Sequence, residues 1–207
     1  LAHYLASREL SGVKTVAYIP RSVQGHAVLA AMACEEIIMA PEAEMGEAGV
    51  DEPAEQEISP TKRAGYREIA DERRTIPVEV ALAMLDRNVE LLKVETEISP
   101  EFVLASQLEE LKKKRAIQSQ TVLKRPGELA QFTGREAREL GFVKYLAVDR
   151  TALAKALSLA PSSLDDDPSL AGEWHAVRIE VKGPITAALA SRVQRLIDDQ
   201  VAAGANF

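Results

Sequence analysis

The spacing of apolar side chains changes several times along the first three quarters of the chain, and each change marks the end of a predicted element. Segments rich in β-branched residues predict strands, and apolar residues three or four positions apart predict helices. The predicted strands cover residues 13–19, 35–40, 89–95, 120–123, 129–132 and 142–148. The predicted helices cover residues 1–10, 25–34, 61–74, 75–85, 99–115, 134–140 and 151–159. This alternation predicts an α/β fold in which helices cover a parallel sheet.

Three segments and one residue pair carry more specific expectations. Residues 25–34 are apolar almost all round, which is typical of a helix that is buried on every side. Residues 42–60 contain seven acidic side chains and two glycines, and they predict a long loop, either a lid over a binding site or a solvated surface loop. Residues 89–95 fit a continuation of the preceding helix or a strand, and we prefer the strand. Thr133 and Glu136 match the capping box T-x-x-E, which predicts that a helix begins there.

A change of composition divides the chain late in the sequence. Residues 160–173 hold two prolines, three serines and three consecutive aspartates, a composition typical of a linker. Residues 174–181 then alternate as a strand, and residues 185–203 predict an amphipathic helix. We therefore expect one large unit over 1–159, followed by this linker and by a second unit that begins at 174 and continues to 207.

Composition and charge argue against several classes of protein. The chain has 25 Lys and Arg against 32 Asp and Glu, and with a net charge of −7 it is not expected to bind nucleic acid. The longest apolar run, Ala27–Cys34, is too short to cross a bilayer. Because Cys34 is the only cysteine and the histidines lack a metal-binding spacing, we expect no disulfide, no metal site and no cofactor.

Two stretches resemble a known family. Residues 13–49 (VKTVAYIPRSVQGHAVLAAMACEEIIMAPEAEMGEAG) combine a strand, a small-residue helix, a second strand that ends in M-A-P, and a glycine-containing loop. This order resembles the central segment of the ClpP/crotonase superfamily. Residues 127–157, with the motif T-G-R-E-A-R-E-L-G-F-V, resemble the closing segment of NfeD-type ClpP-class serine peptidases. The resemblance covers residues 1–159 and implies a ClpP/crotonase-like parallel sheet with helices.

The last part of the chain resembles the opening of the same fold. Residues 174–207 predict a strand, a turn at Gly183-Pro184 and a helix. We therefore expect a fragment of a longer parent with tandem units, in which an incomplete first unit is followed by the opening of a second. In such a fragment the strand at 13–19 lacks a neighbour that the family supplies. An unpaired apolar edge of this kind predicts aggregation of the isolated chain.

The resemblance also implies where the chemistry lies. In ClpP-like and NfeD-like peptidases a nucleophilic serine begins the buried helix, neighbouring backbone N–H groups form an oxyanion hole, and in the NfeD-like enzymes a lysine is the base. Alignment on Met39-Ala40-Pro41 places the family's serine at Gly25. The backbone of Gly25 and His26 would then form the oxyanion hole, without a hydroxyl to attack. This departure predicts that the unit is catalytically impaired.

Three side chains remain as candidate catalytic residues. Ser22, the nearest hydroxyl, is either a nucleophile or a turn residue that caps the helix. Lys62 is the best match to the family's lysine, and it is either a base activated by the positive charge of Arg63 or an ordinary solvated lysine. His26 is either a general acid or base, or a partly buried histidine bonded to a neighbouring carbonyl.

Three functions are compatible with these residues. The first is an NfeD-like ClpP-class serine endopeptidase homologue, impaired in this unit, whose substrate is a peptide or a membrane protein. The second is a non-catalytic module with the same fold that serves assembly or peptide binding. The third is a crotonase-type acyl-CoA enzyme, which would polarise a thioester carbonyl with the same two N–H groups. The resemblance further implies a homo-oligomer and a membrane-associated parent that is extracytoplasmic or membrane-facing.

Overall fold

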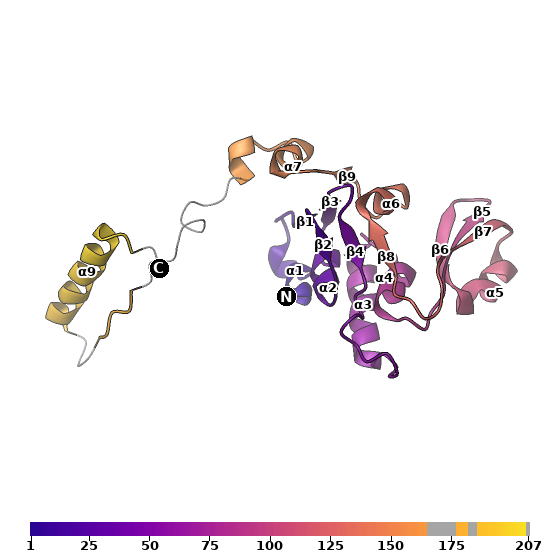
Figure 1. Cartoon of the computed structure of the whole chain (residues 1–207), viewed down its shortest axis with the longest axis horizontal. Coiled ribbons are helices and arrows are strands. Elements are labelled where there is room, and N and C mark those ends of the chain that lie inside the picture. The colour runs from indigo at the N-terminus through magenta and orange to yellow at the C-terminus, as the bar shows by residue number, and fades with distance from the viewer. Residues whose placement is uncertain (165–176, 182–185, 206–207) are drawn as a thin grey trace. The chain divides into compact units, whose positions relative to one another are not determined.

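The computed structural model of the chain describes residues 1–164, 177–181 and 186–205 (Figure 1). Its contacts divide it into two units, Leu1–Ser163 and Leu164–Phe207. The first unit is mixed α/β, as the sequence predicts, with small parallel and antiparallel sheets.

The middle of the first unit consists of two three-stranded sheets. Their strands are β1 Val16–Ile19, β2 Ser22–Val23, β3 Glu36–Met39, β4 Glu44–Gly46, β8 Gln131–Thr133 and β9 Tyr145–Leu146. One sheet has the order β1-β3-β9 and is parallel throughout. The other has the order β2-β4-β8, in which β2 and β4 are parallel and β8 is antiparallel. The strands β1 to β4 therefore enter the two sheets alternately along the chain.

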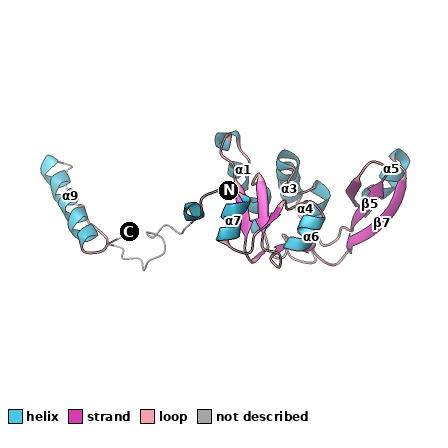
Figure 2. Ribbon diagram, turned by 90° about the horizontal axis from the view of Figure 1, so that it is seen from above, coloured by secondary structure: helices cyan, strands magenta, loops and turns pink. Residues whose placement is uncertain are grey.

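Helices surround these sheets and close the core (Figure 2). They are α1 Ala2–Leu5, α2 Ala27–Met32, α3 Pro60–Arg73, α4 Val78–Leu85, α6 Gly134–Glu139 and α7 Arg150–Ala156, with short 3₁₀ turns at Arg8–Leu10 and Pro161–Leu164. Because β1 and β3 are parallel, the chain must cross over between them, and α2 is part of that crossover. Every residue of β3 is buried, as expected for the central strand of a parallel sheet.

The helix α2 is shorter and less enclosed than predicted for residues 25–34. Val28, Ala31 and Met32 are buried, but Ala27 is exposed. The prediction of a helix buried on every side is therefore wrong. Alanine makes up half of the apolar residues of this segment, and a methyl group gains little from burial, so an alanine on one side of the helix can lie in solvent.

A third sheet is inserted between α4 and β8, and Figure 1 shows it set apart from the other two. It consists of β5 Leu91–Thr96, β6 Pro100–Leu104 and β7 Ile117–Lys124, all antiparallel in the order β6-β5-β7, with α5 Ala105–Lys114 between β6 and β7 along the chain. A small hydrophobic cluster of its own lies beneath α5. Its members are Leu92, Val94 and Val103, packed against Ala105, Leu108, Leu111 and Ile117.

In the inserted sheet one predicted helix is partly wrong, and two predicted strands are confirmed. The helix predicted at 99–115 begins only at Ala105, because Pro100–Leu104 pairs with β5 as a strand. Phe102 has the helical spacing with Ala105 and Leu108, and it also alternates with Leu104 as in a strand, so periodicity does not separate the two. The strand preferred at 89–95 is β5, and the strand predicted at 120–123 is part of the longer β7.

The acidic segment 42–60 is not one continuous loop, because it contains the strand β4. Gly46 ends this strand where β8 passes very close. A side-chain carbon at Gly46 would lie 2.3 Å from the carbonyl oxygen of Ala130, so only glycine lets the two strands pair at this point. The segment from Glu47 to Ser59 then leads to α3 without a further strand.

A buried polar group joins the insertion to the rest of the first unit. Lys124, at the end of β7, is 4% exposed, and its Nζ donates to the carbonyl oxygens of Asp86 (3.1 Å), Arg87 (3.0 Å) and Val89. Burial lowers the pKa of Lys124 to about 8. The carboxylate of Asp86, also buried, forms an ion pair with Arg63 of α3. The lysine thus satisfies the carbonyl groups that follow α4.

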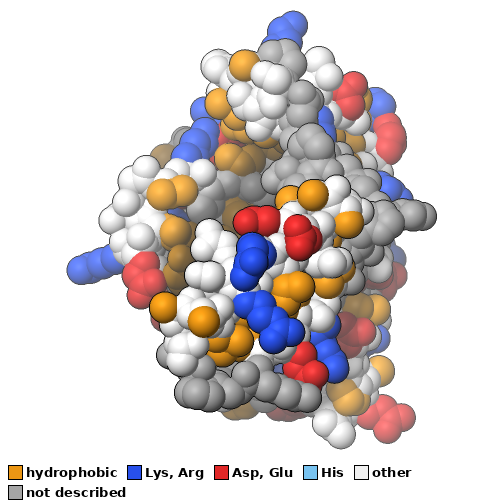
Figure 3. All heavy atoms as spheres, turned by 90° about the vertical axis from the view of Figure 1, so that its left-hand side faces the viewer, with side chains coloured by type: hydrophobic (Ala, Val, Ile, Leu, Met, Phe, Trp, Pro, Cys, Tyr) orange, Lys and Arg blue, Asp and Glu red, His pale blue; other side chains and the backbone are white. Residues whose placement is uncertain are grey.

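The second unit contributes the amphipathic helix α9, Ala187–Ala202, as predicted. The strand predicted at 174–181 lies partly outside the described residues, and the described part, Val177–Val181, is irregular. The apolar side of α9, with Val181, lines a groove of about 550 Å³. Figure 3 shows hydrophobic side chains between Lys, Arg, Asp and Glu side chains on the face turned to the reader.

Candidate functional site

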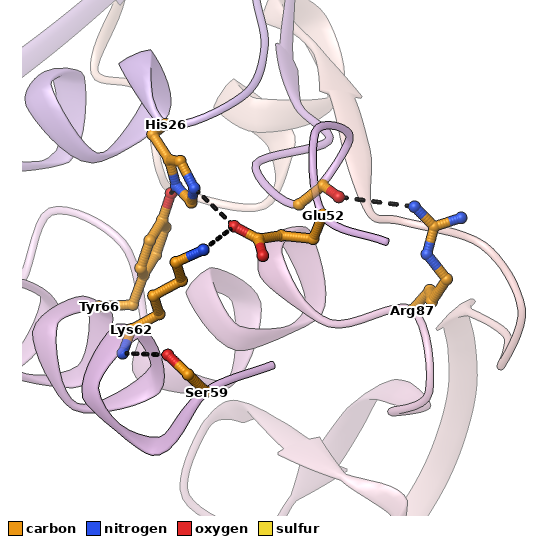
Figure 4. A network of polar contacts seen from close by, with 7 residues as sticks. His26, Glu52, Ser59, Lys62, Tyr66 and Arg87 are labelled. Atoms are coloured by element: carbon orange, nitrogen blue, oxygen red, sulfur yellow. Dashed lines mark hydrogen bonds and ion pairs between the residues drawn. The ribbon is translucent and has the colours of Figure 1, made fainter. Parts of the chain in front are cut away.

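Glu52 lies at the centre of a polar cluster formed by α2, the acidic segment and α3 (Figure 4). Its Oε1 lies 2.9 Å from Nε2 of His26 and also accepts a hydrogen bond from Nζ of Lys62. Nδ1 of His26 in turn lies 3.1 Å from the hydroxyl of Tyr66. The structure therefore brings together two of the predicted site residues, His26 and Lys62, through a carboxylate.

The local sequence explains why these side chains meet. Ser59 caps α3, since its hydroxyl accepts a hydrogen bond from the backbone N–H of Lys62 at 3.3 Å, and Pro60 occupies the first turn. Lys62 and Tyr66 are four residues apart and lie on the same side of α3. His26 lies at the beginning of α2, so its ring reaches the gap between the two helices.

The charges of the cluster are balanced around Glu52. Hydrogen bonds from Lys62 and then from His26 lower the pKa of the Glu52 carboxyl, which stays ionised at neutral pH. Burial raises the pKa of Tyr66, and the negative charge of Glu52 raises it further, so this side chain is a neutral phenol. The phenol of Tyr66 and the carboxylate of Glu52 each form a hydrogen bond with one nitrogen of His26, and together they orient the imidazole ring.

The cluster is open to solvent on one side. The exposed fraction of the side chain is 42% for His26 and 45% for Lys62, against 13% for Glu52. An imidazole held by a carboxylate can transfer a proton, and an ammonium beside it can bind a carboxylate or a carbonyl oxygen of a ligand. The cluster itself contains no aliphatic hydroxyl or thiol for covalent catalysis, because Ser59 is used as the cap of α3.

Gly25 occupies a position that discourages any side chain. Its φ angle is +60°, in the left-handed region that favours glycine. A Cβ at Gly25 would lie 2.8 Å from Oδ2 of Asp51, so that carboxylate would have to move. The N–H of Gly25 also donates to the carbonyl of Glu47 at 3.1 Å, and it is therefore already used within the protein. The oxyanion role predicted for Gly25 would require this bond to open.

Ser22 and Arg63 lie outside the cluster. Ser22 is exposed on β2, pairs with Glu44 of β4, and lines a separate cleft of about 520 Å³. The guanidinium of Arg63 forms an ion pair with Asp86, as described above, so that carboxylate compensates the positive charge that was expected to activate Lys62. Neither residue is brought to Glu52 by the contacts of the described residues.

Two members of the cluster, Glu52 and Tyr66, are absent from the sequence-based candidates. The spacing of Lys62 and Tyr66 is a signal that sequence analysis offers, because residues four apart share one side of a helix. Glu52 gives no comparable signal. It is one of seven acidic residues in the segment 42–60, and only the fold of that segment singles it out.

No protein-family model, curated protein or solved structure matches the chain. Among the described residues, no group of three or more His, Cys, Asp and Glu is placed to hold a metal ion. Within the same residues, none of the helices combines the length and the apolar character that a membrane span requires.

Proposed function

We propose that the chain is an NfeD-like ClpP-class serine endopeptidase homologue of the ClpP/crotonase superfamily, impaired in this unit, that binds peptides without cleaving them. The observation that carries the proposal is the surroundings of Gly25. The position to which the resemblance assigns the nucleophile has a left-handed backbone and faces the carboxylate of Asp51. A serine there would require both strain and displacement of a charged group.

The order of elements supports the family assignment. The parallel pair β1 and β3, with α2 between them along the chain, has the order that the resemblance implies for residues 13–49. The capping box at Thr133 opens α6, and β9 and α7 follow, in the order implied for residues 127–157. The proposed parent is membrane-associated, and its substrate a peptide or a membrane protein.

The polar cluster supports binding rather than cleavage. Lys62, the counterpart of the family's base, forms an ion pair with Glu52, and the serine that it contacts, Ser59, accepts a hydrogen bond from its backbone N–H as the cap of α3. His26 and Lys62 nevertheless keep part of their surface in solvent. The ammonium of Lys62 has three N–H groups and uses one for Glu52, so it can also donate to a carbonyl oxygen or the carboxylate of a peptide.

Two measurements on the whole chain test this function. We expect a fluorophosphonate probe to leave the protein unlabelled while it labels an active serine peptidase in the same assay. Labelling that disappears in Ser22→Ala would contradict the proposal and return the role of nucleophile to that residue.

The second measurement is the fluorescence anisotropy of a fluorescein-labelled unstructured peptide. We expect saturable binding without cleavage, and Lys62→Ala should weaken it by roughly tenfold, since a hydrogen bond from a charged group contributes about 1.5–3 kcal/mol. Lys155→Ala, which removes an exposed lysine of α7, is the matched control and should bind as the unmodified chain does. Equal losses in the two variants would show that Lys62 is not part of the binding site.

A further inference from the structure

The strand β7 forms an exposed edge of the inserted sheet. The order β6-β5-β7 leaves one side of β7 without a partner strand among the described residues. With eight residues, β7 is the longest edge strand that the structure describes, and its residues Gln118–Val122 are all exposed. Such an edge presents a row of backbone N–H and C=O groups that can pair with another strand.

The two edges of this sheet differ in how they are protected. The edge strand β6 begins with Pro100, which has no N–H, and continues with Glu101, whose carboxylate forms an ion pair with Arg115. Proline and charge are common features that prevent edge-to-edge pairing. From Ile117 to Leu123 the strand β7 contains neither. Its open edge therefore lacks the features that keep other strands away.

We propose that β7 pairs with β7 of a second copy of this chain, antiparallel about a twofold axis at Gln120, so that two three-stranded sheets become one of six strands. A twofold interface uses the same surface from both copies, and the edge of an antiparallel strand is complementary to itself in this arrangement. In this register all residues of the uncharged segment 117–123 are paired, and Ile117 lies opposite Leu123 of the second copy. Ser119 then lies opposite Thr121, and Gln118 opposite Val122.

The charges near β7 are compatible with this pairing. The basic residues that precede the strand are held in ion pairs within each copy: Lys112 with Glu109, Lys114 with Glu110 and Arg115 with Glu101. Lys124, at the other end, is buried against backbone carbonyls. Lys113 and Arg125 lie outside the paired segment. No pair of like charges is therefore placed directly opposite within the new ladder, where it would be destabilising.

Sedimentation velocity of the full chain tests the pairing directly. We expect a monomer of 22.5 kDa at low concentration and a fraction of dimer that increases as the protein concentration is raised from about 1 μM to about 1 mM. Gln120→Lys places two ammonium groups opposite each other at the axis and should leave only monomer. Gln56→Lys, the same change on an exposed loop, is the matched control and should dimerise like the unmodified chain.

A cross-link tests the register independently of the association constant. Residues directly opposite in an antiparallel pair have Cα atoms about 4.5–5.5 Å apart, which a disulfide can bridge. Gln120→Cys in a Cys34→Ala background should give a covalent dimer on mild oxidation, and Gln56→Cys in the same background should not. Circular dichroism of each variant shows whether it has the fold of the parent chain.

The proposal is overturned by any of three results. They are a chain that stays monomeric over the whole range, a folded Gln120→Lys variant that associates as before, and a dimer that Gln120→Cys fails to link. Association through the edge of β1, or through a peptide of another protein on β7, would give one of these outcomes.

Discussion

The strands β3 and β7 show two ways in which this chain uses a β-strand. β3 has four residues, all buried, with a parallel neighbour on each side. β7 has twice that length, one neighbour and five consecutive exposed residues. The strand β3 is held in place because all of its residues are buried. The strand β7 depends on the ladder to β5 and on the anchor that Lys124 provides at its end. Length alone therefore says little about how firmly a strand is held.

The same contrast separates the polar groups of the two regions. Around Glu52 the side chains of His26 and Lys62 bind the carboxylate and are nearly half exposed to solvent, so water can replace either of these partners. Around Lys124 a single ammonium serves three carbonyl groups in the interior. Substitutions in the two regions should therefore differ in size, and the following variants measure that difference.

The largest effect is expected for Lys124→Met. The methionine has a similar length but no donor, so the carbonyls of Asp86, Arg87 and Val89 lose their partner. Because each buried polar group without a partner costs about 1–3 kcal/mol, we expect a loss of roughly 3 kcal/mol in the free energy of unfolding, measured in urea. Lys155→Met on the surface of α7 should change it by no more than about 0.5 kcal/mol. Equal losses would mean that the inserted sheet is not anchored by this lysine.

A smaller effect is expected for Gly25→Ser. The left-handed backbone costs a residue with a Cβ about 1–2 kcal/mol, and the exposed carboxylate of Asp51 can turn aside from the new side chain. Gly65→Ser is the matched control, since Gly65 lies in α3 with open space around it and should be unchanged or slightly more stable. Gly25→Ser should also stay unreactive toward the fluorophosphonate probe. A gain of labelling would restore the peptidase hypothesis.

The smallest effect is expected for Glu52→Gln and appears as a change in pH dependence. In the folded chain the pKa of Glu52 lies below its ordinary value of 4.5. The ionised carboxylate therefore adds stability at neutral pH, and this contribution is lost as the pH falls below about 4.5 through the lowered pKa. For a pair this open to solvent the contribution is at most about 1 kcal/mol.

The melting temperature as a function of pH measures this contribution. The unmodified chain should lose stability in acid more steeply than Glu52→Gln does, and Glu139→Gln, an exposed carboxylate of α6, should follow the unmodified chain. Identical curves for all three proteins would show that the cluster adds no stability.

Sequence patterns identified most of the elements, and they failed where one pattern fits two structures. The β-branched and apolar runs gave β1 and β3, and the spacing of apolar residues gave α3 and α9. Pro100–Leu104 is predicted as part of a helix because Phe102 fits the apolar spacing of the residues that follow, and pairing with β5 decides in favour of the strand. Short strands such as β4 are fixed by their neighbours, and their own residues carry little signal.

The candidate site could be predicted only in part. His26 and Lys62 were reached through the resemblance, and the structure places them around one carboxylate. Glu52 is chosen by the path of the acidic segment, which no local pattern encodes. Ser22 was chosen for its closeness in sequence to Gly25, but closeness along the chain does not bring a side chain to a site when a strand carries it away.

Within the first unit the chain enters the inserted sheet and leaves it at the same place, because Leu91 and Lys124 lie opposite each other in the ladder. The thirty-odd residues between them therefore form an appendage with a narrow stem, and they have a small core of their own. Such an element can be lengthened, shortened or exchanged during evolution without disturbing the sheets behind it. The part of this protein most free to acquire a new partner is thus a part that contributes no residue to the cluster around Glu52.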